Sequence, residues 1–258
     1  MLIDTHTHLY SSQFAEDRGE EIKNCLEANV GKMLLPNVDS KSIAGLHQLA
    51  KDYPDVCFPM MGVHPCSIQL ETWKEELSIA KTHLYAKTFN YIAVGEIGID
   101  LHWDKSTLDI QQEAFAEQIK WAKELNLPIV IHARESFQEI FEVVDQYNDE
   151  NLKGIFHCFT GGAEEAEKVI SYGGFLMGIG GVLTFKNGGV AEVIKNYDLK
   201  HFVLETDAPY LAPTPHRGKR NQSSFLPLIA DRMADVFGLS GKEIETVTTE
   251  NAKQLFKI

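Results

Sequence analysis

The chain has 258 residues, 44% of them hydrophobic, and a formal net charge of −13. This length is enough to bury a full core in one large α/β domain or in two small ones. The negative charge excludes a wide basic surface for duplex DNA, although a nucleic-acid end can still enter a metal-containing pocket.

No apolar run approaches the roughly 20 residues needed to span a bilayer. The N-terminus lacks the basic and apolar segments of a signal peptide. The four cysteines lie far apart without CxxC spacing, which is typical of reduced thiols rather than a disulfide framework. We therefore expect a cytoplasmic protein with no membrane partner, and we expect it to be a monomer.

The first nine residues predict a short strand that carries a histidine pair. Side chains alternate between the two faces of a strand, so Asp4, His6 and His8 are expected to point the same way. Two imidazoles side by side on one face are placed as a metal ion requires them.

Seven further apolar segments predict strands, and helical periodicity follows each of them. The expected strands cover residues 32–36, 57–65, 91–96, 128–132, 154–157, 175–180 and 201–207. The expected helices lie around residues 22–30, 40–52, 73–84, 108–125, 140–144, 166–170, 193–194, 222–237 and 241–255. Eight strands alternating with helices predict a (β/α)₈ TIM barrel, as one domain over residues 1–258, rather than a doubly wound sheet.

Side chains of metal-ligating type close five of the expected strands. Active sites of such barrels lie at the C-terminal ends of the strands, and each of these strands is apolar until its end. Four imidazoles and two carboxylates can ligate two divalent ions if one carboxylate bridges them, and Glu96 is the expected bridge. The six expected ligands are His6, His8, Glu96, His132, His157 and Asp207.

Further residues are expected to contact a substrate. His64 closes the strand over 57–65, and Arg134 follows His132 by two residues on the same inward face. Arg217, Lys219 and Arg220 form a basic loop after the eighth strand of an otherwise acidic chain, which favours contacts with phosphate groups.

Seven motifs, spread over nearly the whole chain, resemble those of the TatD family of metal-dependent deoxyribonucleases, which is similar to the wider amidohydrolase superfamily. They are DTHTH at 4–8, GVHP at 62–65, GEIGID at 95–100, HAR at 132–134, FHCFTG at 156–161, ETDAPYL at 205–211 and RGKRN at 217–221. The resemblance implies the same six metal ligands. The family commonly continues RGKRN with Glu-Pro, whereas Gln222-Ser223 follow here, so contacts made by that pair are not implied.

The expected function is hydrolysis of phosphodiesters at DNA ends by a hydroxide that bridges two divalent ions, Mg, Mn or Zn. Asp207 is the expected general base, and Asp4 and Glu205 are expected to orient the ligands. An alternative is an ester or amide hydrolase, such as one that removes an aminoacyl group from tRNA. A metal-binding scaffold without catalysis is a third interpretation, which the complete ligand set disfavours.

Overall fold

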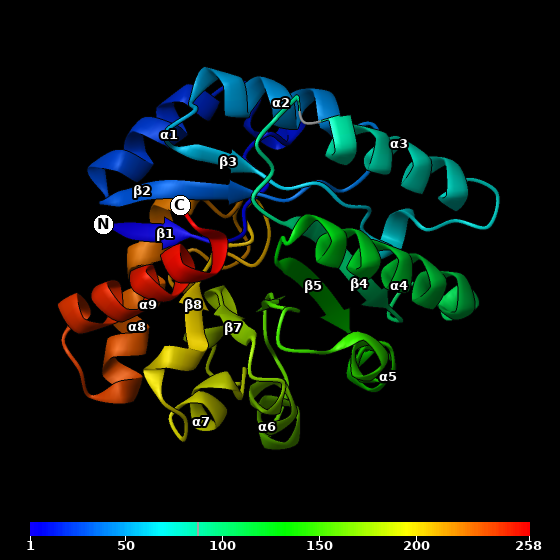
Figure 1. Cartoon of the computed structure of the whole chain (residues 1–258). Coiled ribbons are helices and arrows are strands. Elements are labelled where there is room, and N and C mark those ends of the chain that lie inside the picture. The colour runs from blue at the N-terminus through cyan, green and yellow to red at the C-terminus, as the bar shows by residue number, and fades with distance from the viewer. Residues whose placement is uncertain (87) are drawn as a thin grey trace.

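The computed structural model describes residues 1–86 and 88–258, and in them eight parallel strands stand inside a ring of helices (Figure 1). The strands are β1 (Leu2–Asp4), β2 (Val30–Leu35), β3 (Cys57–Pro59), β4 (Val94–Asp100), β5 (Ile129–Arg134), β6 (Gly154–Phe156), β7 (Phe175–Ile179) and β8 (Phe202–Leu204). The helices are α1 (Arg18–Glu27), α2 (Ile43–Asp52), α3 (Trp73–Ala86), α4 (Leu108–Leu125), α5 (Phe137–Tyr147), α6 (Ala163–Ser171), α7 (Val190–Ile194), α8 (Leu226–Phe237) and α9 (Gly241–Phe256). This alternation confirms the predicted (β/α)₈ barrel.

The barrel is closed at two seams, the junction of β8 with β1 and the junction of β3 with β4, which lie outside the regular strand pairs. Parallel pairing runs through β1–β2–β3 and, separately, through β4 to β8. At one seam Asp207 N donates to His6 O at 2.9 Å, and at the other Gly95 N donates to Met61 O at 3.2 Å. Each seam therefore lies at or beside expected metal ligands, so barrel closure itself brings these ligands together.

The barrel interior is filled by apolar side chains that the strands turn inward. The buried interior cluster includes Ile3, Leu34, Met60, Val130, Ile155, Val203 and Phe256. The last of these belongs to α9, whose Asn251 Nδ2 donates to Phe202 O at the start of β8 at 2.8 Å. Helix α9 therefore covers the N-terminal ends of the strands, and polar groups collect at the opposite end.

Local capping signals set several helix ends where the sequence predicts them. Helix α4 spans the predicted 108–125 and ends at Asn126, which adopts a left-handed conformation with φ 53°. Helix α9 begins after Ser240, whose side chain accepts from Glu243 N while the Glu243 carboxylate accepts from Ser240 N. None of the described helices is long and apolar enough to cross a bilayer.

The strand expected over the first nine residues is wrong in its length. β1 ends at Asp4, and the chain then bends. Because Ile3 belongs to the barrel interior, the neighbouring Asp4 takes the opposite face of the strand. The bend then brings His6 and His8 inward, so the expectation that Asp4 shares one strand face with them is also wrong.

Strand β4 is longer than predicted and ends at Asp100, so Glu96 lies inside the strand and not at its end. Gly98 makes this possible. Its φ is +139°, and a Cβ there would lie 2.1 Å from His132 O of the neighbouring β5. Only glycine allows this close approach, which keeps β4 paired with β5 as far as Asp100 and Arg134.

Two other expected strands are shorter than predicted. β3 ends at Pro59, so His64 lies on the loop that follows it. β8 ends at Leu204, so Glu205 and Asp207 come directly after the strand. These ligand-type residues therefore stand on irregular segments beyond the strand ends, where the pleat no longer decides which way they point.

Candidate metal centre

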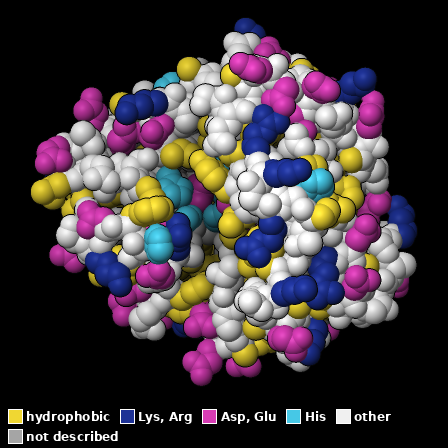
Figure 2. Space-filling view, turned by 180° about the vertical axis from the view of Figure 1, so that it is seen from behind, with side chains coloured by type: hydrophobic (Ala, Val, Ile, Leu, Met, Phe, Trp, Pro, Cys, Tyr) yellow, Lys and Arg dark blue, Asp and Glu magenta, His cyan; other side chains and the backbone are white. Residues whose placement is uncertain are grey.

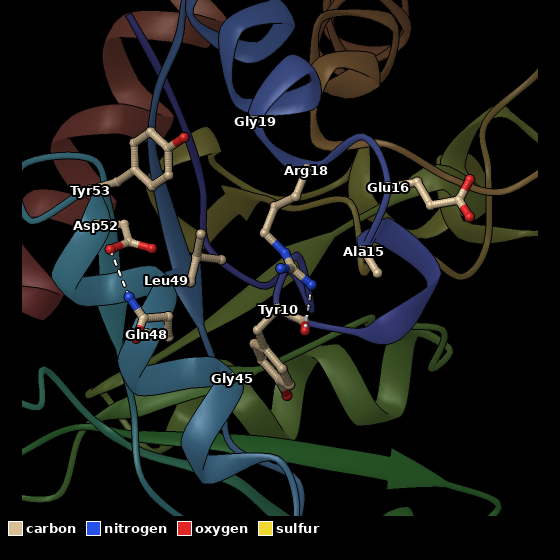
Figure 3. Close-up of a pocket in the computed structure, with 10 residues that line it drawn as sticks. All are labelled: Tyr10, Ala15, Glu16, Arg18, Gly19, Gly45, Gln48, Leu49, Asp52 and Tyr53. Atoms are coloured by element: carbon tan, nitrogen blue, oxygen red, sulfur yellow. Dashed lines mark hydrogen bonds between the residues drawn. The ribbon is translucent and has the colours of Figure 1, made fainter.

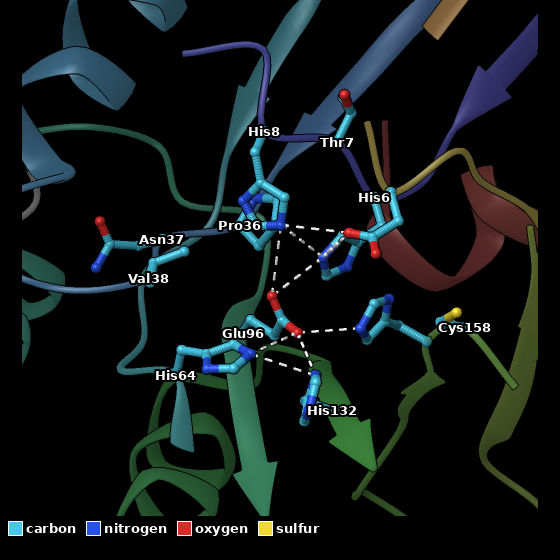
Figure 4. A network of polar contacts seen from close by, with 12 residues as sticks. His6, Thr7, His8, Pro36, Asn37, Val38, His64, Glu96, His132 and Cys158 are labelled. Carbon is cyan, nitrogen blue, oxygen red and sulfur yellow. Dashed lines mark hydrogen bonds and ion pairs between the residues drawn. The ribbon is translucent and has the colours of Figure 1, made fainter. Parts of the chain in front are cut away.

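Glu96 lies amid a cluster of histidines at the C-terminal end of the barrel (Figure 4). Asn37, just after β2, holds its backbone in place. Asn37 N donates to Gly95 O and Glu96 N donates to Asn37 O, both at 3.1 Å. The Asn37 amide also donates to Gly62 O at 2.7 Å, so the position of Glu96 is tied to the segments after both β2 and β3.

One oxygen of the Glu96 carboxylate faces the residues that follow β1 and β8. Oε2 lies 3.1 Å from His6 Nε2 and 3.7 Å from His8 Nε2. Asp207 Oδ1 lies 3.8 Å from the first of these nitrogens and 3.5 Å from the second. Two imidazole nitrogens and two carboxylate oxygens therefore converge on one side of Glu96.

The other carboxylate oxygen faces histidines from three different parts of the barrel. Glu96 Oε1 lies 2.9 Å from His132 Nδ1, 3.0 Å from His157 Nε2 and 3.3 Å from His64 Nε2. The sequence predicts that His64 contacts a substrate, and in the structure it lies in the same group as the expected ligand His132. The single carboxylate thus separates two groups of nitrogen and oxygen donors.

The tautomer of His8 follows from its neighbour Tyr10. The tyrosine hydroxyl has one proton, which it donates to Pro36 O at 2.6 Å. It must therefore accept the hydrogen bond of 2.8 Å from His8 Nδ1. This bond places the His8 proton on Nδ1 and leaves the lone pair of Nε2 directed at the centre.

Carboxylates fix two further rings in the same way. His132 Nε2 lies 2.9 Å from Asp100 Oδ2, and His157 Nδ1 lies 3.3 Å from Glu205 Oε1. Each carboxylate holds the outer nitrogen of its ring, which directs the inner nitrogen of both rings at Glu96 Oε1.

These donors fit divalent cations. Three sets of three residues bring their ligand atoms within 4.8 Å of one another, namely His6, His8 and Glu96, then His64, Glu96 and His132, and finally His6, His157 and Glu205. Two buried atoms in these sets, His6 Nδ1 and Glu205 Oε2, have no hydrogen-bond partner among residues 1–86 and 88–258. Buried polar atoms are rarely left unsatisfied, and imidazole with carboxylate is a donor set suited to Zn and Mn.

The electrostatics favour an anionic centre surrounded by imidazoles. Burial by itself would raise the pKa of Glu96, but the imidazoles of His64, His6 and His157 hold that pKa well below its usual range. Burial likewise opposes the lowering of the pKa of Asp207, which results from the adjacent His8 imidazole and from His157 and His6 nearby. Both carboxylates are therefore ionised at neutral pH and available as ligands.

The centre opens to solvent on one side only. The side chains of His6 and Glu96 are 0% and 3% exposed, whereas those of Asp207, His64 and His132 are 13%, 14% and 16% exposed. Figure 2 shows histidine side chains gathered in a hollow of the face turned away from the viewer in Figure 1. A substrate that enters this hollow meets these three side chains first.

Asp4 contacts Thr206 and the backbone of His6, and it does not contact the imidazole rings. Its carboxylate accepts from Thr206 N at 2.9 Å, from Thr206 Oγ1 at 2.6 Å and from His6 N at 3.3 Å. Nearby, Ser223, which stands where the family commonly has proline, is buried and donates to Thr7 Oγ1 at 2.9 Å. Both residues therefore join the segment after β1 to the segments after β8.

The four basic residues expected to contact phosphate have different surroundings. Arg134 is exposed, and its guanidinium carbon lies 5.4 Å from the centroid of the Trp103 ring. The guanidinium carbon of Arg217 lies 3.9 Å from the Phe185 ring centroid. Lys219 is exposed.

Arg220 differs from the other three because its guanidinium already has an anionic partner. Its Nη1 donates to Asp17 Oδ1 at 2.9 Å, and Nη2 pairs with the second oxygen of the same carboxylate. This ion pair joins the basic loop to the segment before α1.

Three residues of the centre were missed by the sequence interpretation, namely Tyr10, Asn37 and Asp100. A signal existed for the first, because Tyr10 follows His8 at the same spacing that joins His8 to His6. For Asp100 the signal was its place as the last residue of the GEIGID motif. In the structure it pairs in register with Arg134. Asn37 carried no local signal, since its partners lie on the segments after β3 and within β4.

A separate pocket of about 380 Å³ lies between α1 and α2 (Figure 3). Tyr10 and Arg18 line it. The guanidinium of Arg18 donates to Leu9 O at 2.7 Å and to Tyr10 O and Ser11 O at 3.0 Å. These bonds fix the loop that carries Tyr10, so the residues that line this pocket support the metal centre.

Replacing Asp100 with alanine is expected to weaken the affinity for divalent cations about 10–100-fold, because His132 loses the acceptor that fixes its tautomer. Asparagine at this position keeps a neutral acceptor and should weaken the affinity less. Titration calorimetry with Mn²⁺ measures both variants, and Asp109→Ala, an exposed change in the first turn of α4, is the control. Wild-type affinity in a folded Asp100→Ala protein would contradict the role assigned to this carboxylate.

Comparisons with known proteins agree with this geometry. A family model described as TatD related DNase matches residues 3–257. The metal-dependent hydrolase YabD of Bacillus subtilis (strain 168) is 37% identical over 260 residues, which cover 100% of both chains. The 3'-5' ssDNA/RNA exonuclease TatD of Pantoea vagans (strain C9-1) is 31% identical over 263 residues, again 100% of both chains. The crystal structure of YJJV, a TatD homologue from Escherichia coli K12, matches with a TM-score of 0.93 and 26% identity, over 100% of this chain and 98% of that one.

Proposed function

Since the chain belongs to the TatD family of metal-dependent hydrolases, we propose that it is a nuclease that hydrolyses phosphodiester bonds at the ends of DNA or RNA strands. The observation that carries the proposal is that the two oxygens of the Glu96 carboxylate face two different groups of nitrogen and oxygen donors. A bridging carboxylate of this kind suits a site for two divalent cations.

Our proposed ligands are the six side chains that the sequence predicts, with Mg, Mn or Zn as the candidate ions. One group consists of His6, His8 and Asp207, and the other consists of His132 and His157, with Glu96 shared by both. Divalent cations held there would lower the pKa of a water molecule towards ~7 and would polarise an oxygen of the substrate. His64 lies in the second group and also faces solvent, so we propose that it contacts the substrate beside the centre.

Asp207 is the proposed general base. It is ionised at neutral pH because its pKa is held below the usual range, against the effect of burial, by the neighbouring imidazoles of His8, His157 and His6. Its side chain is 13% exposed, so it can reach a water molecule that enters the hollow. A carboxylate at this position can take the proton of the attacking water.

Phosphate contacts are proposed for Arg134, Arg217 and Lys219, which are the predicted basic residues without a strong anionic partner among the described residues. Arg220 already binds the Asp17 carboxylate through both terminal nitrogens, so we propose that it stabilises the basic loop instead. The carboxylate already neutralises the charge of this guanidinium, which weakens its attraction for phosphate.

The test is a comparison of three substrates, with and without chelator, after elemental analysis of the purified protein. We expect up to two equivalents of divalent metal, and turnover of a single-stranded oligonucleotide and of a chromogenic phosphodiester that the chelator abolishes. Hydrolysis of an aminoacyl ester in preference to both would favour the ester hydrolase alternative. Trace metal after reconstitution, together with turnover that resists the chelator, would refute the proposed metal chemistry.

A further inference from the structure

An exposed aromatic ring and a cation stand together at the mouth of the barrel. Trp103, in the loop after β4, is 72% exposed, whereas the other two tryptophans, Trp73 and Trp121, are 7% and 2% exposed. The guanidinium of Arg134, the last residue of β5, lies 5.4 Å from the Trp103 ring centroid. A large apolar ring left this open in a folded chain is a candidate contact surface for a ligand.

The position of Trp103 is set by the end of β4. Its backbone N–H and that of His102 both donate to Asp100 Oδ1, at 3.4 Å and 2.9 Å. The His102 ring packs edge-on against the indole, with centroids 4.9 Å apart, and its Nδ1 lies 2.7 Å from Glu135 Oε1. The indole is therefore contacted by His102 and by the Arg134 guanidinium, and most of its surface remains open to solvent.

The same carboxylate ties this loop to the metal centre. Asp100 Oδ1 binds the loop, and Asp100 Oδ2 binds His132 Nε2 at 2.9 Å. Arg134 follows His132 by two residues on β5, which is a rise of about 6.6 Å along a strand. This rise is comparable to the distance between neighbouring phosphates of an extended nucleic-acid strand.

Building on the proposed function, we propose that Trp103 and Arg134 form a subsite for one nucleotide next to the reacting phosphate. The base stacks on the open part of the indole, and the phosphate of that nucleotide binds the Arg134 guanidinium. Base–aromatic stacking is independent of sequence, because every base has a flat π face, and a guanidinium suits phosphate.

The subsite selects unpaired strand ends. In a duplex both faces of each inner base are covered by its neighbours, so no face is free to lie on an external ring. A frayed or single-stranded end exposes its bases and can stack on the indole. The chain, which is acidic overall, would thereby recognise a strand by one stacked base and one phosphate rather than by a wide basic surface.

Binding of a fluorescein-labelled single strand to the metal-loaded protein, followed by fluorescence anisotropy, tests the subsite without relying on turnover. The strand has phosphorothioate linkages, so that cleavage does not interfere. We expect Trp103→Ala to weaken binding roughly 5- to 100-fold and Trp103→Phe to restore most of the loss, because phenylalanine still stacks. Tyr85→Ala removes an exposed aromatic ring from α3 and is the matched control, with binding like the wild type.

Abasic strands identify the partner of the ring. A base is removed at each terminal position of the strand in turn, and every strand is measured with the wild type and with Trp103→Ala. At one position the removal should abolish the difference between the two proteins, because base and ring then form a coupled pair. A blunt duplex should bind both proteins equally and weakly.

The outcomes separate this subsite from the proposed function. A Trp103→Ala protein that binds every strand like the wild type overturns the subsite, even where the wild type cleaves oligonucleotides. A wild type that binds single strands through Trp103 but hydrolyses no phosphodiester refutes the nuclease proposal and leaves the subsite standing. If the wild type binds no single strand, the subsite is refuted as well.

Discussion

A Glu96→Gln protein is expected to lose at least about 10³-fold in turnover and to bind less than one equivalent of divalent metal. The carboxylate is the one group shared by both sets of donors, with Oε1 and Oε2 facing different histidines. Several kcal/mol of transition-state stabilisation by the cations depend on it, which corresponds to this loss of rate. Elemental analysis and steady-state kinetics on a single-stranded oligonucleotide measure both effects.

The control for this variant is the same chemical change on the surface. Glu192→Gln alters an exposed carboxylate on α7 that pairs with Lys195, and it should leave metal content and turnover as in the wild type. Circular dichroism of Glu96→Gln must show the wild-type content of helix and strand. A folded Glu96→Gln protein with two equivalents of metal and normal turnover would rule out a bridging carboxylate.

The Asp207→Asn variant is expected to lose about 10²–10⁴-fold in kcat while its KM stays close to that of the wild type. An amide cannot accept the proton of the attacking water, and a general base contributes about this factor. The group formed by His132, His157 and one Glu96 oxygen does not include Asp207, so at least one equivalent of metal should remain.

Asp235→Asn, an exposed change on α8, is the matched control for Asp207→Asn. It separates the effect of losing a charge from that of losing the base. If Asp207→Asn instead lowered metal content to zero with a proportional loss of turnover, its role would be that of a ligand alone. Unchanged kcat with full metal content would remove Asp207 from the mechanism altogether.

Most of the fold could be predicted because it depends on local patterns. Apolar strands alternate with amphipathic helices along the chain, and such alternation admits few arrangements. The side of a strand on which a ligand lies could also be predicted from a buried residue two positions earlier, as for Val130 and His132. This spacing follows directly from the pleat of a strand.

The prediction of strand ends and of side-chain directions failed where the regular pleat of a strand stops or is altered. The bend after Asp4 puts His6 and His8 on the side opposite to that residue, and Gly98 extends β4 beyond Glu96. Both depend on contacts with other strands, namely the bond of Asp4 to Thr206 and the approach of Gly98 to His132. A local pattern does not contain these partners.

The sequence by itself determined the barrel and the end of it at which the six proposed ligands lie, because strand periodicity and residue chemistry are local properties. Only the tertiary structure decided how these side chains are used. Closure of the barrel turns one oxygen of Glu96 to His6 and the other to His132, and it places Asp17 beside Arg220. These partners are separated by 36 to 203 residues along the chain, so their meeting depends on strand pairing and helix packing across the whole barrel.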